Sequence, residues 1–500
     1  MLYRSTRDKT IKIESAQAIK TGLSKDGGLF VPETLPAVSS AEIEAMAHMS
    51  YGDRAVFVLS KFLTDFDLFE LKECVDLAYN KEKFETDTIA PVYKLNNSVY
   101  FLELWHGPTC AFKDMALQIL PHLLTKSIQK CGSDKECVIL VATSGDTGKA
   151  ALEGFKDVNK TRIFVFYPER GVSEIQKLQM ITQDGNNVGV AAVAGNFDDA
   201  QTGVKKIFTD KEYEEVLAVN GFELSSANSI NWGRLVPQIV YYFSAYADLV
   251  KSEEIKLGDK INFAVPTGNF GNILAGYYAK QMGLPVNKFI CASNENNVLT
   301  EFINTGVYDR NRKFYTTISP SMDILVSSNL ERLLFNVTGD DDAQVRAYMD
   351  ALAAEGKYTV SADVLTKIKD NFYAGYCDDD ATMAAIKAVN DDYSYVMDPH
   401  TAVGKCVYEQ YAAETGDTTK TVIASTASPF KFNQSVLIAL KGLASVAGKN
   451  EFELLDILSQ ESNMRIPKSL AELKSKPRLF NMSCEKQQMQ QVVSEFLQVE

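Results

Sequence analysis

The chain has 500 residues, with 51 Lys and Arg against 65 Asp and Glu, and a formal net charge of −14. This acidic balance disfavours nucleic acids and acidic membranes as partners, because both need a basic surface. Since 46% of the residues are hydrophobic and 23% are charged, we expect a folded protein, and the length predicts two or three domains. No apolar run reaches the roughly 18 residues of a membrane helix, and the N-terminal residues lack the apolar core of a secretory signal.

The cysteines and histidines argue against a metal site and against a disulfide framework. The eight cysteines are scattered, no two have the CxxC spacing, and the chain has four histidines. We therefore expect no bound metal, no disulfides and a reducing cytoplasmic location.

The first ninety or so residues predict a mostly helical domain, placed at 1–98. Ser39 and Glu42 have the spacing of a capping box, in which each side chain satisfies a free backbone amide. The residues that follow predict further helices near 55–62 and 68–77, and the stretch 26–32 predicts a turn that leads into a short strand.

From about residue 99 the pattern changes to that of an α/β protein. Short apolar runs alternate with helix-like stretches, which predicts parallel sheets covered on both faces. The runs lie at 138–142, 163–167, 261–265, 289–292 and 421–424. We expect a smaller α/β domain at 99–220 and a larger one at 221–500, with the acidic stretch 338–392 as a peripheral insertion.

The stretch WHGPTCAFKDM places Lys113 after a Gly-Pro loop, near the start of a helix expected over 114–130. Pro121 should kink or split that helix. Apolar neighbours would desolvate the lysine, which lowers the pKa of its amine and makes it available as a nucleophile or base. The competing interpretation is an ordinary lysine with its ammonium in solvent.

Two glycine-bearing loops each join an expected strand to an expected helix. Backbone amides and hydroxyls in VATSGDTGKA, at 141–150, could hold a carboxylate or phosphate at the helix N-terminus, although the loop is not a P-loop. The glycines of VPTGNFGNILAG, at 265–276, would let backbone amides close on a phosphate. Either loop could also be a plain strand–turn–helix connection.

The fourth stretch, IASTASPFKF at 423–432, ends a strand in hydroxyl side chains that could hydrogen-bond a heterocycle or could cap a proline turn. Taken together, an activated lysine, a carboxylate loop, a phosphate loop and a hydroxyl are the parts that a pyridoxal phosphate enzyme needs. The combination is far more specific than any one of the four stretches.

The motifs resemble those of the threonine synthase family, of the long microbial and fungal type. This family lies within the tryptophan-synthase-β-like class (fold type II) of pyridoxal phosphate enzymes. The matching stretches run in order along most of the chain: YRSTRD, GLSKDGGLFVPE, HGPTCAFKD, ATSGDTG, SANSIN, PTGNFGN and STASPFKF. The agreement is weakest at about 300–400.

The resemblance implies a role for each matching residue. Lys113 would form the Schiff base with pyridoxal 5′-phosphate, and Thr426 would face the pyridine nitrogen. The cofactor phosphate would lie on Gly268, Asn269, Phe270, Gly271 and Asn272. Residues near the substrate carboxylate would be Thr143, Ser144, Asp146 and Thr147, with Asp146 also close to the cofactor's 3′-oxygen and its protonation state open. The substrate phosphate would meet Asn228 and Arg234, and His106 would face the site.

The implied reaction converts O-phospho-L-homoserine and water to L-threonine and phosphate, the last step of threonine biosynthesis. The freed Lys113 amine would act as general base. Relatives suggest a monomer, with a homodimer as the alternative. Two other functions stay open: a sister lyase such as a threonine dehydratase or cysteine synthase, and a non-catalytic binding protein of the same fold.

Overall fold

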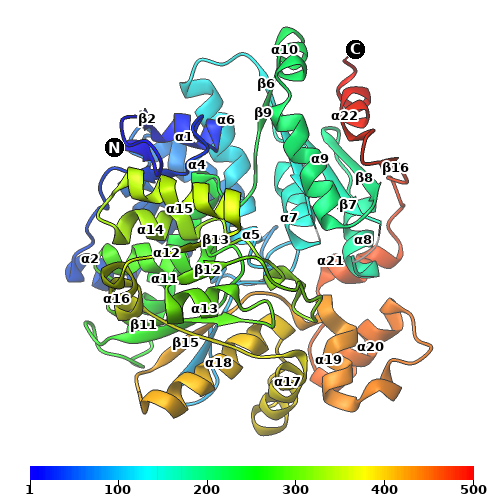
Figure 1. The fold of residues 1–500 in the computed structure, drawn as a ribbon. Coiled ribbons are helices and arrows are strands. Elements are labelled where there is room, and N and C mark those ends of the chain that lie inside the picture. The colour runs from blue at the N-terminus through cyan, green and yellow to red at the C-terminus, as the bar shows by residue number, and fades with distance from the viewer. Residues whose placement is uncertain (144, 170–171, 500) are drawn as a thin grey trace.

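The computed structural model describes residues 1–143, 145–169 and 172–499. Figure 1 shows two α/β parts side by side, each built on its own sheet, with the N-terminal segment packed on the part drawn at the left. The predicted α/β class with two mainly parallel sheets is confirmed. Within the described residues, no helix has the length and apolar character needed to cross a membrane.

The smaller sheet has five strands, and every neighbouring pair in it is parallel. In spatial order these are β16 (Ser483–Glu485), β8 (Val188–Ala194), β7 (Thr161–Pro168), β6 (Glu136–Ala142) and β9 (Phe222–Ser225). Both faces are buried, because Val138 and Leu140 of β6 belong to one apolar cluster while Ile139 and Val141 belong to the other. The helices around this sheet are α7 (Asp146–Phe155), α8 (Glu174–Ile181), α9 (Phe197–Thr209), α10 (Lys211–Val219) and α22 (Met489–Leu497).

The larger sheet has six strands, and only its edge strand β4 runs antiparallel to its neighbour. In order they are β14 (Phe372–Tyr376), β11 (Val286–Ser293), β10 (Ile261–Pro266), β15 (Thr421–Ser425), β5 (Val99–Glu103) and β4 (Val92–Lys94). The helices that pack on it or on one another beside it include α11 (Trp232–Lys251), α12 (Gly271–Gln281), α13 (Val298–Thr305) and α18 (Pro399–Thr415).

The N-terminal segment combines helices with a small antiparallel sheet. The expected helices are present as α2 (Ser40–Met46), α3 (Tyr51–Phe62) and α4 (Leu68–Ala78), together with α1 (Ser15–Thr21). The capping box of Ser39 and Glu42 is confirmed, with both reciprocal hydrogen bonds. The expected short strand, β3 (Phe30–Pro32), joins β1 (Leu2–Ser5) and β2 (Lys12–Glu14).

The sheets cross the expected domain ranges. Strand β5 was expected in the smaller domain but pairs with β15 in the larger sheet, whereas β9 and β16 come from the range 221–500 and pair in the smaller sheet. Sheet membership depends on pairing between segments far apart in the sequence, which local apolar runs do not report. The domain ranges themselves stay a prediction.

The acidic stretch 338–392, expected to be a peripheral insertion, carries three helices and one edge strand of the larger sheet. The helices are α15 (Asp342–Glu355), α16 (Ala362–Asn371) and α17 (Asp379–Tyr393), and the edge strand is β14. In β14, FYAGY, a glycine and tyrosines interrupt the apolar run that marks the other strands. A second strand, β13 (Lys357–Thr359), pairs with β12 (Val307–Asp309) outside the two main sheets.

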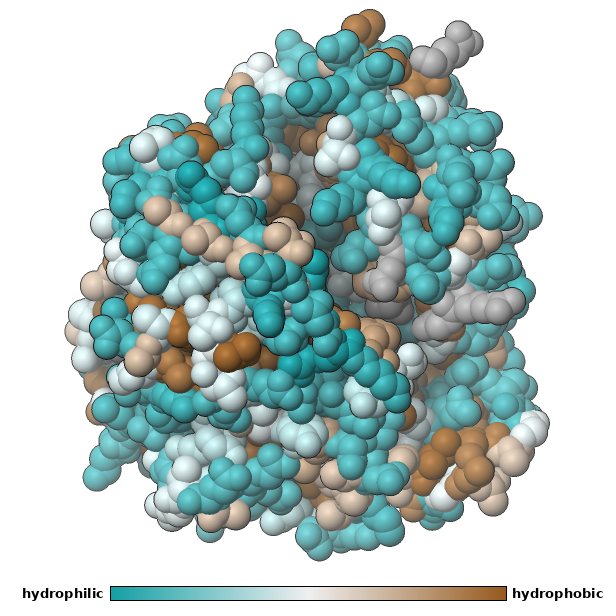
Figure 2. All heavy atoms as spheres, in the orientation of Figure 1, coloured by the Kyte–Doolittle hydropathy of each residue, from teal (hydrophilic) through white to brown (hydrophobic). Residues whose placement is uncertain are grey.

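Further helices lie in the C-terminal half of the chain. They are α14 (Leu330–Val337), α19 (Asn433–Lys441), α20 (Glu451–Ser462) and α21 (Lys468–Ala471). Figure 2 shows a mainly hydrophilic surface that is hollowed between the part carrying α9 and the part carrying α14 and α15.

Pro121 divides the helix that the sequence predicts over 114–130. The structure has α5 (Asp114–Leu117) and α6 (Leu120–Lys130), with Pro121 in the first turn of α6, where its missing amide costs no helical hydrogen bond. Gly154 of α7 packs against the end of α5: a Cβ there would lie 1.9 Å from the carbonyl oxygen of Leu117. This close approach fixes α5, and Lys113 immediately before it, against α7.

We predict that Gly154→Ala destabilises the protein by about 1–3 kcal/mol or more, since the added methyl group must push backbone away from backbone. The measurement is chemical unfolding of the full chain. Gly52→Ala in α3 is the matched control, because a Cβ at Gly52 would meet Val75 at 3.4 Å and Ser50 Oγ at 3.8 Å, without a clash. That change should be neutral or slightly stabilising. Equal stability of the two variants would contradict the packing described.

Candidate active site

Lys113 lies where the loop after β5 docks on the end of β15. The amide of Phe112 donates to the carbonyl oxygen of Thr426 at 2.8 Å, and Ala111 forms a β-bridge with Ala427. The lysine is the N-cap of α5, and its Nζ lies 3.3 Å from Ser321 Oγ. Burial lowers the pKa of Lys113 to about 8, although the nearby Asp146 carboxylate opposes the shift. The sequence-based expectation of a desolvated lysine therefore agrees with its surroundings.

Asp146 is the first residue of α7 and is 5% exposed. Its Oδ2 lies 4.0 Å from Lys113 Nζ and accepts from Ser321 Oγ at 3.3 Å, while Oδ1 accepts from Gln176 Nε2 at 3.0 Å. Burial by itself would raise the pKa of Asp146, but the charges of Lys431 and Lys113 hold that pKa well below its usual range. The carboxyl group whose protonation the sequence left open is therefore ionised.

Lys431 is the nearest cation to Asp146, and sequence reasoning did not single it out. Its side chain is 0% exposed, its Nζ lies 2.6 Å from Asp146 Oδ1, and it donates to the carbonyl oxygen of Thr109 at 2.9 Å. The available signal was a lone lysine between two phenylalanines in STASPFKF, since a lysine in such apolar company needs a charged partner when buried.

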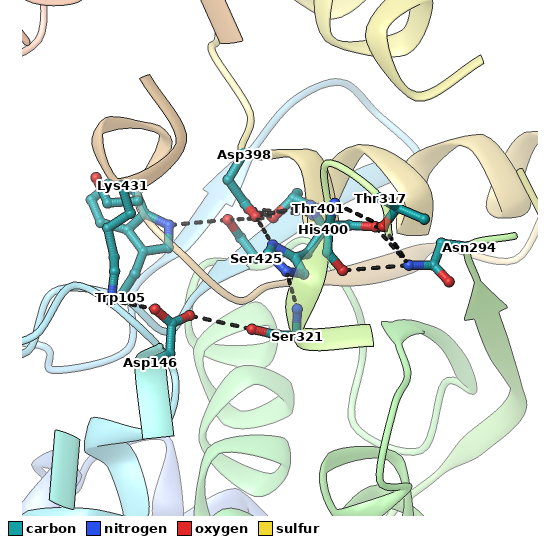
Figure 3. A network of polar contacts seen from close by, with 12 residues as sticks. Trp105, Asp146, Asn294, Thr317, Ser321, Asp398, His400, Thr401, Ser425 and Lys431 are labelled. Carbon is teal, nitrogen blue, oxygen red and sulfur yellow. Dashed lines mark hydrogen bonds and ion pairs between the residues drawn. The ribbon is translucent and has the colours of Figure 1, made fainter. Parts of the chain in front are cut away.

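A buried polar network holds Ser321 in place (Figure 3). The amide of Ser321 donates to His400 Nε2 at 3.2 Å, and His400 Nδ1 lies 2.8 Å from Asp398 Oδ1. Because Nε2 accepts a hydrogen bond, His400 is the neutral tautomer with its proton on Nδ1, toward Asp398. The histidine lies inside the first turn of α18, after its N-cap Asp398.

The loop between β10 and α12 has the properties of an anion cradle. Phe270 is the N-cap in a left-handed conformation, with φ 62°, and gives no side-chain cap. Within the described residues, none of the backbone amides of 268–273 has a hydrogen-bond acceptor. The loop is held from the other side, because the carbonyl oxygens of Gly268 and Asn269 accept from Ser327 Oγ and Asn329 Nδ2.

Two residues of this stretch, Asn272 and Gly268, also contact other parts of the protein. Asn272 Oδ1 accepts from the hydroxyls of Tyr241 and Tyr242, each at 2.7 Å, and its buried Nδ2 has no partner among the described residues. A Cβ at Gly268 would lie 2.8 Å from the carbonyl oxygen of Ser321, so Gly268 packs directly on the residue whose hydroxyl contacts Lys113. The cradle and the lysine are thus adjacent.

Of the residues expected at the substrate carboxylate, Asp146 and Thr147 lie in the first turn of α7, and Thr143 lies shortly before it. Thr143 Oγ1 accepts from the amides of Gly145 and Gly148 at 3.0 and 2.9 Å, so its hydroxyl shapes the loop. Thr147 is half-buried in the first helical turn. Ser144 lies outside the described residues.

Thr426 and Ser425 share a strand end but differ in their partners. The Thr426 side chain is 5% exposed and forms no hydrogen bond within the described residues. By contrast, Ser425 Oγ accepts from Trp105 Nε1 at 3.0 Å and from Thr401 Oγ1 at 3.2 Å. Of the two hydroxyls, that of Thr426 is the one left for a ligand.

Arg234 is a buried cation without an acidic partner. It lies in the first turn of α11, is 6% exposed, and donates from Nη1 to the carbonyl oxygen of Ala227 at 2.7 Å. Within the described residues it forms no ion pair, and burial lowers the pKa of Arg234 to about 10. It is close enough to Lys113 to contribute to that residue's lowered pKa.

Asn228 and His106 are less closely tied to this cluster. Asn228 is half-buried in the turn before α11, and its carbonyl oxygen accepts from the amide of Asn231. His106 Nε2 lies 2.7 Å from Glu103 Oε2, and its ring stacks on that of Trp105. The described contacts of His106 thus lead to Glu103 and not to Lys113.

These features fit pyridoxal phosphate. Lys113 is a largely enclosed amine, with a side chain that is 11% exposed, and its pKa of about 8 leaves it reactive toward an aldehyde. A row of backbone amides without described acceptors at a helix N-terminus suits a phosphate. Thr426 supplies a hydroxyl without a described partner at the end of a parallel strand, where ligands bind in open α/β folds.

Known protein families match the chain from end to end. The model described as threonine synthase N terminus matches residues 2–79, that described as pyridoxal-phosphate dependent enzyme matches 85–426, and that described as threonine synthase, C-terminal, matches 401–493. The central match and the fold define a pyridoxal-phosphate dependent enzyme of fold type II.

Individual relatives narrow the class. The threonine synthase of Saccharomyces cerevisiae is 36% identical, over 95% of this chain and 94% of that protein. The crystal structure of PLP-bound threonine synthase from Brucella melitensis superposes with a TM-score of 0.87 at 36% identity, covering 99% of this chain and 98% of that one. The chain belongs to the threonine synthase family. Human threonine synthase-like 1 is 43% identical over 85% of this chain, but the chain spans only 58% of that protein's length.

We predict that Gly271→Ala weakens the binding of pyridoxal phosphate at least tenfold without unfolding the chain. A Cβ at Gly271 would lie 3.4 Å from Asn329 Nδ2, which is an ordinary contact, so the protein itself has room for the added methyl group. A phosphate bound to the backbone amides of the loop would be hindered by that methyl group. The measurements are an absorbance titration with the cofactor and the melting temperature of the cofactor-free chain. Gly52→Ala serves as control. Unchanged affinity in Gly271→Ala would place the phosphate elsewhere.

Proposed function

We propose that this chain is a threonine synthase that converts O-phospho-L-homoserine and water to L-threonine and phosphate, as a carbon–oxygen lyase that uses pyridoxal phosphate. We further propose that it works in the cytoplasm as a monomer. The observation that carries the proposal is the surplus of positive charge in the site: Lys113 and Lys431 flank the carboxylate of Asp146, and Arg234 adds a third positive charge near Lys113. A substrate with a carboxylate and a phosphate supplies the missing negative charges.

The residues that would hold the cofactor come from four segments. Lys113 would tether it, the amides of 268–272 would hold its phosphate, Thr426 would meet the pyridine nitrogen and Asp146 would lie toward the 3′-oxygen. When bound, the cofactor supplies a conjugated ring that accepts the electrons released when a proton leaves the substrate.

The Lys113 amine is the general base in this proposal. Its Nζ would take the proton from Cα of the substrate and later a proton from Cβ, while phosphate leaves from Cγ. Protons would return to Cγ and to Cα, and the hydroxyl of water would add at Cβ while its remaining proton goes to the released phosphate. A base works best when its pKa lies near the working pH, and the pKa of Lys113, about 8, meets that condition. Ser321 Oγ, 3.3 Å away, would hold Nζ in position between these transfers.

Two regions would bind the substrate: one with a guanidinium group for its phosphate, and one with backbone amides and hydroxyls for its carboxylate. Arg234 and Asn228 would bind its phosphate, since a guanidinium fork matches phosphate oxygens. The start of α7, with Ser144 and Thr147, would bind the α-carboxylate, and Thr143 would hold that loop through its bonds to Gly145 and Gly148.

We predict that Lys113→Ala abolishes threonine formation, by many thousandfold, and removes the visible absorbance of the bound cofactor, because one amine is both tether and base. Threonine should be identified as product together with phosphate release. Lys72→Ala, an exposed lysine in α4, is the control and should retain activity. Substantial turnover by Lys113→Ala would exclude the assignment.

We predict that Arg234→Met raises KM for O-phospho-L-homoserine tenfold or more and weakens inhibition by inorganic phosphate in parallel. The change removes a buried cation that has no carboxylate partner among the described residues, so the phosphate loses its charged partner. Arg234→Lys should recover part of the loss, since it keeps the charge but not the fork. Normal KM and normal phosphate inhibition in Arg234→Met would place the substrate phosphate elsewhere.

A further inference from the structure

Two lysines, Lys431 and Lys113, lie near the same carboxylate at the centre of the site. Lys431 Nζ is 2.6 Å from Asp146 Oδ1, whereas Lys113 Nζ is 4.0 Å from Asp146 Oδ2. The side chain of Lys431 is 0% exposed and that of Asp146 is 3% exposed, so neither charge is screened by water. Asp146 therefore forms its short ion pair with Lys431 and only a long one with Lys113, the lysine expected to act in the reaction.

The other charged groups near Lys113 do not alter this division. Arg234 contributes a further positive charge from α11. Asp114 follows Lys113, but its oxygens accept from the amide and the hydroxyl of Thr109, at 2.8 and 2.7 Å. His400 faces the backbone of Ser321 and is neutral by its hydrogen bonds. Asp146 is therefore the anion that decides whether Lys113 holds its proton.

We propose that Lys431 is a positioning residue whose ammonium neutralises Asp146 and thereby lets the Lys113 amine lose its proton at a lower pH than it would beside an unpaired Asp146. This inference deepens the proposed function, on which it rests for the role of Lys113. Without Lys431, the nearest cation to a buried Asp146 would be Lys113, and the two would form an ion pair that keeps the lysine protonated. A protonated lysine can neither attack an aldehyde nor remove a proton.

The test follows the protonation of Lys113 in the full-length chain freed of cofactor. An amine-reactive label is applied over a range of pH, and its rate at Lys113 is read by peptide mass spectrometry. The rate should rise with pH through a midpoint near 8, because only the unprotonated amine reacts. Lys431→Met should move the midpoint upward by a unit or more, which slows labelling about tenfold at pH 7.

Further variants separate charge from structure. Asp146→Asn should lower the midpoint, and the double variant Asp146→Asn with Lys431→Met should lie between the two single variants, since one removed attraction offsets one removed repulsion. Lys431→Arg should keep the midpoint close to that of the unaltered chain. Lys405→Met is the matched control, because Lys405 is also buried and paired with a carboxylate, Glu409, but has no described contact with Asp146.

An unchanged midpoint in folded Lys431→Met overturns the inference. If that variant does not fold, the comparison moves to the Asp146→Asn background, where removing Lys431 should still raise the midpoint, and equal midpoints overturn the inference there. The proposed function is tested separately. If the midpoints are as expected but the chain forms no threonine, the role of Lys431 is supported and the proposed reaction is wrong. If the chain forms threonine but the Lys113 midpoint does not shift in Lys431→Met, only the proposed role of Lys431 is wrong.

Discussion

The ion pair between Asp146 and Lys431 is the interaction on which the electrostatics of the site depend. A carboxylate that is 5% exposed is costly to bury unless it is paired and hydrogen-bonded. Asp146 meets both conditions, with a lysine on one oxygen and the Ser321 hydroxyl on the other. Because the pair is satisfied, the desolvation of Lys113 lowers the pKa of its amine and is not cancelled by a full counter-charge.

The topology of the two sheets brings the members of this cluster together. Asp146 begins the helix after β6 in the smaller sheet, whereas Lys431 follows β15 in the larger one. Lys113 comes from the loop that connects the two, since β5 belongs to the larger sheet and α5 packs on α7 beside the smaller. The ion pair is therefore also a contact between the two halves, and the site exists only when both are in place.

The local motifs of the site could be predicted from the sequence, because each is a strand, a loop and a helix in direct succession. Lys113, the 268–272 loop and Thr426 lie in such units, and the strands and the break at Pro121 followed from local rules. Lys431 and Ser321 could not be found in this way. Each acquires its meaning from a partner more than 170 residues away, and the sequence around Ser321 has no strand or glycine signal to mark it.

The same limit applies to the assignment of strands to sheets. The run FYAGY does not look like a buried strand until it pairs beside β11, and β5 cannot be assigned to a sheet before β15 is placed next to it. Hydrophobic periodicity reports which residues are buried but not which strands are neighbours. Local sequence patterns did not determine which residues far apart in the sequence pair with one another, either in the sheets or in the site.

The charge of the whole protein and the charge of the site have opposite signs, and this difference has a thermodynamic consequence. The chain carries −14, yet the described cluster around Lys113 contains more cations than carboxylates. Burial has already removed the water that would solvate Arg234, and no described carboxylate replaces it. An anion that enters therefore finds a donor whose desolvation was completed on folding, so less free energy is lost on binding than at an exposed arginine. At long range the net negative charge of the protein repels anions, so the attraction for an anion has to come from the cations of the site itself.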